Sequence, residues 1–394
     1  MADYIPFVTS IAGAELVKSI YGDAAFMRVP LQYFAAFTSA LPPGPKRWID
    51  PCIDGMDDVD SRKGDPNKPN PWFEYVKKFH CFEKIADIGF QQSPVRASVE
   101  AFVNSVMDRC HAAHATWITV PQLPAVNDAS RNKINRALAA AVGKWRTASS
   151  FSGRLILPFV VTHQGQINLK TERNKKLDQL ARCYHDAGAD GTWIVDASLN
   201  DESGSATLRS KRLPGLISVH EEMNEKISSK IRVAGPYWGA NLVLWAKGLV
   251  DYPAIGVGSG YQYFLSGRPG GRPPTVKVAI PSLRRRTELP GLANWLTDAI
   301  GKLGPSHPAS KEFAGIKAKL TPLSDAARAR ADVARFYQEW VSSIASTPKT
   351  GRSMAMFQDL SAAYALGKAL PDLENDGPAR RPECVAEPLM MSCL

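Results

Sequence analysis

Eight short apolar runs, separated by amphipathic stretches, fill the first two thirds of this 394-residue sequence and limit its fold more than any other feature. They cover residues 4–9, 26–31, 47–53, 116–122, 155–162, 191–197, 230–235 and 254–258. Strands that alternate with helices predict a parallel sheet of the α/β class. Eight such units predict a closed (β/α)8 barrel of the TIM type, with an open doubly wound parallel sheet as the alternative, because periodicity does not distinguish the two.

The pattern changes after the eighth run. A Pro/Gly connector, RPGGRPP at residues 268–274, is followed by one more strand-like run and then by mostly helical sequence. The sequence therefore predicts a barrel over residues 1–290 and a helical C-terminal extension, packed on the barrel, over residues 291–370. Residues 371–394 have few apolar side chains to bury, which predicts a flexible tail.

The charge balance is basic, with 48 Lys and Arg against 38 Asp and Glu, a formal net charge of +10. This excess favours a nucleic acid or a phosphorylated small molecule as partner, although a basic surface also serves solubility alone. The longest strongly apolar run, residues 155–161, is far too short to span a membrane, so no membrane partner is expected. Self-association into a homo-oligomer is compatible with the sequence.

Cysteine usage points to a reducing compartment. The six cysteines are scattered and include no C-x-x-C pair, so neither a disulfide framework nor a zinc motif is indicated. Cys110, His111 and His114 have helical spacing but no obvious second ligand pair, so no metal site is predicted there. We expect a cytoplasmic protein, and the sequence leaves its cofactors unknown.

Two aspartates follow apolar runs where barrel strands should end. Asp50 in RWIDPCIDG and Asp196 in WIVDAS are candidates for general acid/base chemistry, because catalytic groups in these barrels lie at the strand carboxyl ends. Asp87 in KIADIGFQQSP has a similar placement, with capping of a helix or strand as its alternative role. Asp57, Asp58 and the other acids of the loop after Asp50 read either as a solvated loop or as oxygen ligands of a divalent cation.

Polar and glycine-rich segments follow the fifth and eighth runs. His163, Gln164 and Gly165 in VVTHQGQ could contact a ligand, the glycine through its backbone and the glutamine through its amide, or could serve loop structure alone. Gly256, Gly258 and Gly260 in IGVGSG could cradle a phosphate, or mark tight backbone packing. In GPYWG, Tyr237 and Trp238 could stack on a base or sugar, with core packing as the alternative.

The order of these segments resembles the tRNA-guanine transglycosylase superfamily, (β/α)8 enzymes that exchange a purine base at a nucleic-acid glycosidic bond. IDPCIDG takes the place of the family's D-S-G-G-x-Q segment and makes Asp50 the counterpart of its motif aspartate. IADIGFQQSP resembles F-D-E-C-x-P, which implies base recognition by Asp87. VVTHQGQ looks like the family's V-Q-G-G turn, which implies base contacts from Gln164 and Gly165.

The chain also departs from that family. LWAKGLVDYPAIG is similar to the family's G-x-D-x-F-D-C segment, but Pro253 or Ala254 replaces the attacking aspartate and leaves Asp251 as the nearby acid. The zinc-binding C-x-C-x-x-C is missing. The leading hypothesis is therefore a barrel enzyme that acts on a nucleotide, nucleobase or nucleic-acid glycosidic bond through acid/base aspartates. The alternatives are a non-catalytic barrel that binds nucleic acid or protein through a basic surface, and a metal-dependent hydrolase built on the acidic loop.

Overall fold

The computed structural model describes most of the chain, namely residues 4–21, 26–34, 47–58, 63–65, 68–87, 96–125, 129–162, 165–199, 212–257, 261–267 and 276–394. No helix in these ranges is both long enough and apolar enough to cross a membrane.

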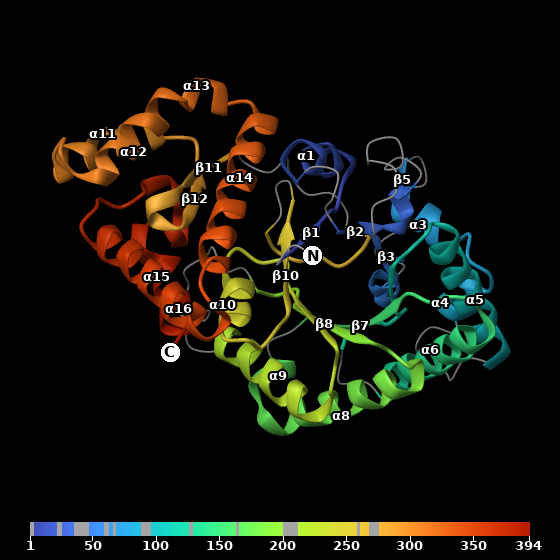
Figure 1. The fold of residues 1–394 in the computed structure, drawn as a ribbon. Coiled ribbons are helices and arrows are strands. Elements are labelled where there is room, and N and C mark those ends of the chain that lie inside the picture. Colours follow the sequence, from blue (N-terminus) through green and yellow to red (C-terminus); the bar gives the residue numbers. More distant parts are fainter. Residues whose placement is uncertain are drawn as a thin grey trace.

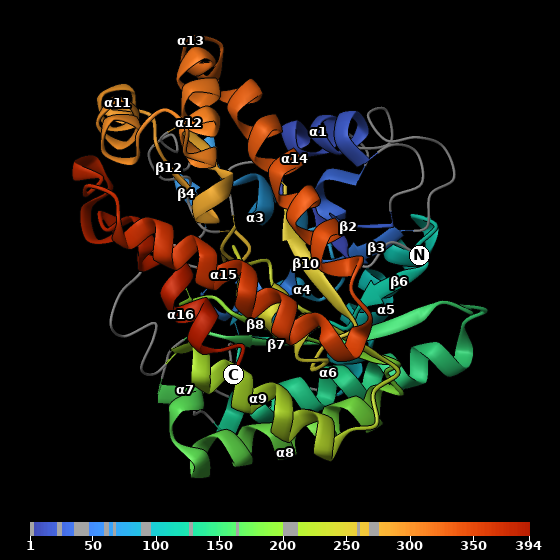
Figure 2. The ribbon, with the colours of Figure 1, turned by 60° about the vertical axis from the view of Figure 1, so that its left-hand side comes forward.

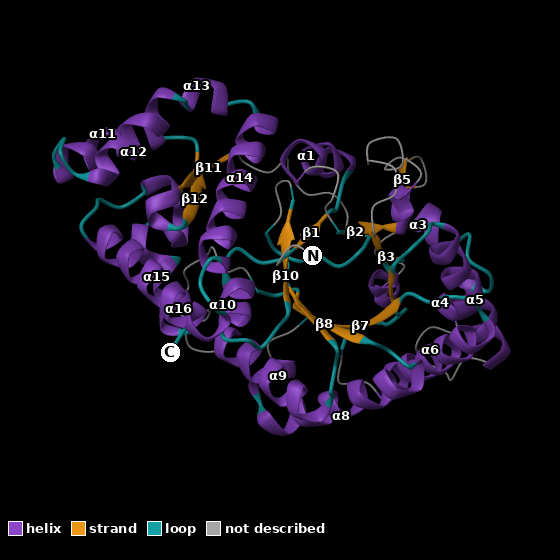
Figure 3. Cartoon of the chain, viewed as in Figure 1, coloured by secondary structure: helices purple, strands orange, loops and turns teal. Residues whose placement is uncertain are grey.

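Eight parallel strands form a closed barrel in the order β1-β10-β9-β8-β7-β6-β3-β2, with helices around it (Figures 1 and 3). They are β1 (Ile5–Phe7), β2 (Met27–Pro30), β3 (Arg47–Asp50), β6 (Trp117–Thr119), β7 (Arg154–Val161), β8 (Gly191–Asp196), β9 (Ile231–Ala234) and β10 (Tyr252–Gly256). The first and last strands pair directly, with Ile5 opposite Ala254, and this pairing closes the ring. The predicted (β/α)8 barrel is confirmed, and each predicted run overlaps one of the strands.

Large aromatic side chains fill the barrel interior. The ring of Trp193 from β8 lies 5.2 Å from that of Trp48 on β3 and 5.5 Å from that of Phe7 on β1. Both indole nitrogens find acceptors, since Trp48 Nε1 donates to Thr119 Oγ1 at 2.8 Å and Trp193 Nε1 donates to the Gly235 carbonyl at 2.8 Å. These bonds allow two tryptophans to be buried without an unpaired N–H group.

Helices of varied length surround the barrel. They are α1 (Ile11–Tyr21), α3 (Pro71–Val76), α4 (Phe82–Asp87), α5 (Arg96–Ala112), α6 (Ala129–Ala148), α7 (Gly165–Asn168), α8 (Lys170–Ala187), α9 (Leu213–Lys226) and α10 (Ala240–Ala246). A short hairpin of β4 (Gly64–Asp65) and β5 (Lys68–Pro69) lies between β3 and α3. Helix α8 buries Leu177 and Leu180 and ends at Gly188, whose φ of 59° suits a left-handed C-cap.

The C-terminal extension combines a hairpin with further helices (Figure 2). Its elements are β11 (Lys277–Ile280), β12 (Arg285–Glu288), α11 (Leu292–Leu303), α12 (Pro308–Ala318), α13 (Leu320–Leu323), α14 (Ala326–Ala345), α15 (Arg352–Lys368) and α16 (Ala386–Met391). Helix α14 buries one apolar stripe, made of Val333, Phe336, Trp340 and Ile344, in the core that it shares with the barrel. Trp295 and Phe313 belong to a second, smaller core between the hairpin and α11 to α13.

The end of the chain packs against the extension. Helix α16 contacts α15, and the side chains of Val385 and Leu389 are buried in the main core. Asp376 forms a buried ion pair with Arg285 of β12. The expectation that residues 371–394 have little to bury is therefore wrong, because a few well-placed apolar residues and one buried charge suffice to dock this segment.

The close approach of α6 to α8 gives a prediction for stability. A Cβ added at Gly143 of α6 would overlap the Asp186 carbonyl oxygen of α8, whereas a Cβ at Gly315 of α12 would meet nothing within 4 Å. Alanine is favoured over glycine in a helix by about 1 kcal/mol, and overpacking costs about 1–3 kcal/mol. We expect Gly143→Ala to lower the free energy of unfolding and Gly315→Ala to raise it, as measured by urea denaturation. Equal stabilisation by both substitutions would contradict the packing argument.

Candidate active site at the barrel mouth

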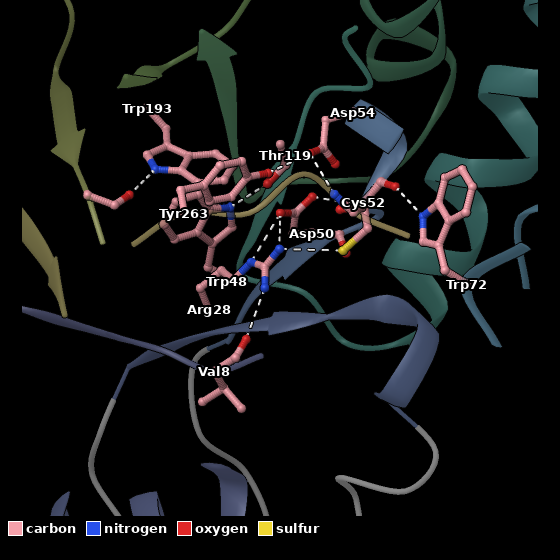
Figure 4. A network of polar contacts seen from close by, with 12 residues as sticks. Val8, Arg28, Trp48, Asp50, Cys52, Asp54, Trp72, Thr119, Trp193 and Tyr263 are labelled. Atoms are coloured by element: carbon pink, nitrogen blue, oxygen red, sulfur yellow. Dashed lines mark hydrogen bonds and ion pairs between the residues drawn. The ribbon is translucent and has the colours of Figure 1, made fainter. Parts of the chain in front are cut away.

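A buried ion pair lies at the carboxyl ends of β2 and β3 (Figure 4). Arg28 Nε donates to Asp50 Oδ2 at 3.0 Å, and Arg28 Nη2 donates to the same oxygen. Arg28 Nη1 donates to the Val8 carbonyl at 2.9 Å, and the guanidinium lies 4.2 Å from the centre of the Phe7 ring. Burial alone would lower the pKa of Arg28, but the charge of Asp50 and its neighbours raises it above the ordinary value. Asp50 is therefore held in a buried ion pair by Arg28 inside the barrel mouth.

A second carboxyl group lies one turn further along the chain. Asp54 belongs to the 3-10 helix Ile53–Asp58 and is 6% exposed. Its Oδ2 accepts hydrogen bonds from Tyr263 Oη at 2.7 Å and from the Ser266 N–H at 3.0 Å. Burial raises the pKa of Asp54, the charge of Asp50 adds to this rise, and the hydrogen bonds from Ser266 and Tyr263 offset part of it. Asp54 therefore keeps its proton to higher pH than an ordinary aspartate.

Residues 261–267, the mouth segment, cover this pair of acids. Tyr263 inserts its ring into the barrel, 5.3 Å from the ring of Trp193 and 6.1 Å from that of Phe7. Asn70 Nδ2 donates to the Gly267 carbonyl at 2.7 Å. The backbone of Gly55 approaches the Ser266 carbonyl so closely that a Cβ would overlap it. The mouth segment is thus held against the loop that follows β3.

Both acids line one small cavity. Its volume is about 10 Å³, which is about the room of one water molecule. Its polar lining comes from Asp50, Asp54, Thr119, Gln122, Trp193 and Tyr263. The acid paired with Arg28 and the acid with a raised pKa therefore share one small, partly apolar space at the carboxyl ends of the strands, where (β/α)8 enzymes carry their chemistry.

Asp196 does not join this cavity. It is fully buried at the end of β8, three residues from Trp193, so strand alternation places the two side chains on opposite faces of the strand. Its Oδ1 accepts hydrogen bonds from the Ser198 N–H at 2.7 Å and from Ser198 Oγ at 2.6 Å. Burial raises the pKa of Asp196, and the bonds to Ser198 offset part of the rise. Asp196 therefore ends its strand at the carboxyl side of the barrel without lining the cavity of Asp50 and Asp54, and its acid/base role stays a prediction.

Asp251 lies at the other end of the barrel. It precedes β10, and its carboxylate accepts from Arg232 Nε at 3.0 Å and from Arg232 Nη2 at 2.8 Å. Arg232 is the second residue of β9, so this ion pair joins the amino ends of two neighbouring strands. Structural pairing accounts for Asp251, and its placement gives no support to the expected catalytic role.

Tyr237 and Trp238 serve core packing. Both are fully buried, and Trp238 Nε1 donates to the Arg284 carbonyl at 2.8 Å. The Trp238 ring lies 5.1 Å from that of Tyr337 and 6.0 Å from that of Phe336, both on α14. Of the two roles that the sequence leaves open for these residues, the structure bears out core packing, because they form the joint between the barrel and the extension.

The remaining predicted site residues contribute little to the described geometry. Gly256 is the buried last residue of β10, Gly165 is the first residue of α7, and Asp87 ends α4. The other predicted positions, His163, Gln164, Gly258 and Gly260, lie outside the described residues. Within the described part of the chain, no group of three or more His, Cys, Asp or Glu residues could hold a metal ion.

Sequence reasoning missed two residues that define the site, Arg28 and Tyr263. A charged residue in the short run FMRVPL was a signal for the first, because an arginine inside a buried strand needs a partner. Tyr263 carried no comparable signal, since it lies beyond the last barrel strand. The chain matches no family model and no curated protein, so the site is interpreted from its own geometry.

Proposed function

We propose that the protein is a barrel enzyme that acts on a nucleotide, a nucleobase or a nucleic-acid glycosidic bond, with Asp54 as the proton donor or acceptor. The observation that carries this proposal is the pairing of two unlike carboxyl groups in one cavity. Asp50 is paired with Arg28, whereas burial and the neighbouring Asp50 raise the pKa of Asp54. A buried carboxyl group whose pKa is raised beside a second acid is typical of acid/base sites.

The two acids suit chemistry at a glycosidic bond. Cleavage breaks the bond between the sugar carbon and the base nitrogen, and its electron pair leaves with the base, which takes up a proton. A water molecule or an incoming base then forms the new bond to the sugar carbon and gives up a proton. Asp54 can supply the first proton and take back the second, and Asp50 beside it can stabilise the positive sugar. The proposal uses no covalent intermediate, because Pro253 and Ala254, which occupy the place of the attacking aspartate in the transglycosylase superfamily, lie within β10. The net charge of +10 supports an anionic substrate.

The direct test of proton transfer by Asp54 is to compare the turnover of the Asp54→Asn variant with that of wild type. Wild-type protein would be incubated with a panel of ribonucleosides, deoxyribonucleosides, their monophosphates, tRNA and DNA, and the released or exchanged base followed by liquid chromatography and mass spectrometry. We expect Asp54→Asn to lower turnover by about a hundredfold or more, because it removes the transferable proton. The matched control is Asp372→Asn, which alters a half-exposed acid, 3.4 Å from Arg380, in the extension.

Stability measurements separate loss of chemistry from loss of fold. Because the pKa of Asp54 is raised in the folded protein, its protonated form stabilises the fold at low pH, and this contribution is lost as pH rises through the folded-state pKa. The asparagine side chain of the Asp54→Asn variant cannot ionise, and we expect the variant to unfold at neutral pH with at least wild-type free energy. Turnover within about twofold of wild type in a folded Asp54→Asn variant would overturn the proposal.

A non-catalytic binding function is the second candidate. It is favoured by the size of the cavity, about 10 Å³, which has no room for a base or a sugar. Binding of arbitrary RNA or DNA that weakens steeply with salt, without turnover of any panel member, would favour this function. In that case Asp50→Asn and Asp54→Asn would leave the affinity unchanged, because neither buried acid faces a basic surface.

A further inference from the structure

A buried lysine without a partner lies between α6 and α8. Lys176 of α8 is 5% exposed, and its Nζ has no hydrogen-bond partner among the described residues. It lines a cavity with a volume of about 30 Å³. The other polar residues that line this cavity are Gln122, Asn132, Asn135, Gln179 and Cys183. An ammonium group buried without a hydrogen bond is unfavourable, so a ligand that accepts from it would be stabilised here.

The surrounding groups compensate the positive charge only in part. Burial lowers the pKa of Lys176, and the charge of Glu172, one turn earlier on α8, offsets part of this fall through space. Burial raises the pKa of the Cys183 thiol to about 12, which keeps that group neutral. Asn135 uses its side chain to hold Leu123, accepting from its N–H at 2.8 Å and donating to its carbonyl at 3.1 Å. Among the residues that the structure describes, no carboxylate lines the cavity.

We propose that this cavity binds a phosphate group, with Lys176 as its charged partner and the amides of Asn132 and Gln179 as further donors. An anion would give the ammonium the charge-assisted hydrogen bonds that the protein itself does not provide. The volume corresponds to about two water molecules, which is room for two of the oxygens of a phosphate group. Amide donors on two helices can point at such an oxyanion from either side.

The proposed phosphate site adjoins the candidate active site. Gln122 and Pro158 line both the cavity of Lys176 and the cavity of Asp50 and Asp54. Gln122 is fixed at this boundary, because its Nε2 donates to the Asn135 carbonyl at 3.0 Å and to the Pro121 carbonyl at 2.9 Å. The phosphate of a nucleotide and free inorganic phosphate present the same chemistry to Lys176. The phosphate site does not depend on the proposed proton transfer.

Equilibrium binding tests the site without any turnover. Inorganic phosphate would be titrated into wild type, Lys176→Met and Lys175→Met by isothermal calorimetry at constant ionic strength. Lys175→Met is the matched control, since Lys175 is its exposed neighbour, 3.0 Å from Glu172. We expect one phosphate per wild-type chain, affinity at least about tenfold weaker in Lys176→Met, and affinity within about twofold of wild type in Lys175→Met.

Adenosine monophosphate, titrated in parallel, distinguishes a nucleotide phosphate from free inorganic phosphate as the natural ligand. A Lys176-dependent gain over inorganic phosphate indicates a nucleotide, and equal affinity indicates free phosphate.

Thermal unfolding shows whether a loss of phosphate binding in Lys176→Met comes from a folding defect. Without phosphate, we expect Lys176→Met to melt at or above the wild-type temperature, because it removes an unpaired buried ammonium. Added phosphate should raise the melting temperature of wild type and Lys175→Met but not that of Lys176→Met. Absence of saturable phosphate binding in wild type, or unchanged binding in a folded Lys176→Met, would overturn the proposal. Neither result bears on Asp54.

Discussion

Replacing Arg28 with methionine is expected to lower the free energy of unfolding by about 3–5 kcal/mol, because the substitution leaves the buried Asp50 carboxylate without its partner. The side chains of both residues are 4% exposed, so water does not replace the lost interaction. The Val8 carbonyl also loses its donor, and Phe7 loses the guanidinium that lies over its ring. Urea denaturation of the purified variant, followed by circular dichroism, measures the change.

Two further variants test whether the effect of Arg28→Met comes from the buried charge of its partner. Arg154→Met removes a half-exposed ion pair with Asp190, and we expect a change of about 1 kcal/mol or less. The double substitution Arg28→Met with Asp50→Leu removes both buried charges, and we expect it to recover much of the loss. A small effect of Arg28→Met alone would show that water reaches Asp50, and the description of the Arg28–Asp50 ion pair as shielded from water would be wrong.

Acid should destabilise the protein through His220, a buried residue of α9. Burial and the positive charge of Arg232 lower the pKa of His220 from 6.5 to about 3. The unfolded chain therefore binds a proton at this histidine below pH 6.5, whereas the folded protein does so only near pH 3. The free energy of unfolding should fall as pH decreases through this window, by about 1.4 kcal/mol per pH unit. Urea denaturation at about pH 7, 6, 5 and 4 measures the slope.

Substitution of two different histidines tests whether His220 causes this pH dependence of the free energy of unfolding. His220→Gln should flatten the dependence between the two pKa values, 6.5 and about 3, because glutamine does not titrate. His185→Gln, at an exposed position near the end of α8, is the matched histidine substitution for comparison. Carboxyl groups add their own dependence at the acid end, so the informative quantity is the difference between each variant and wild type at the same pH. If the free energy of unfolding had the same pH dependence in wild type and His220→Gln, the acid sensitivity would arise from other groups.

The barrel strands could be predicted from sequence because each depends on local properties. A run such as LILPFVV is buried wherever it is placed, and the repeating order of strand and helix restricts the topology. Closure of the ring is different, since it depends on pairing between Ile5 and Ala254, which no local pattern encodes. The apolar stripe of α14 was similarly visible, whereas the docking of Val385 and Leu389 depends on surfaces that other segments create.

The candidate site was predicted only in part for the same reason. Asp50 was found because an acid follows an apolar run, but its partner Arg28 lies 22 residues earlier on a neighbouring strand. The orientation of Asp196 could have been found, because alternation along WIVD separates it from Trp193. Tyr263 could not, since it lies 209 residues after Asp54, to which it donates a hydrogen bond. The resemblance to transglycosylases stays a prediction.

The barrel needs the mouth segment, which follows the last barrel strand in the sequence, so the barrel and the start of the extension must be encoded together. Tyr263 is packed inside the ring, yet it is encoded after the last barrel strand, on the way to the C-terminal hairpin. A gene shortened at the end of β10 would still encode all eight strands, but the aromatic interior would be open to water and Asp54 would lose both of its donors. Recombination at this boundary, which is a common route to new multidomain proteins, would therefore deliver an incomplete barrel.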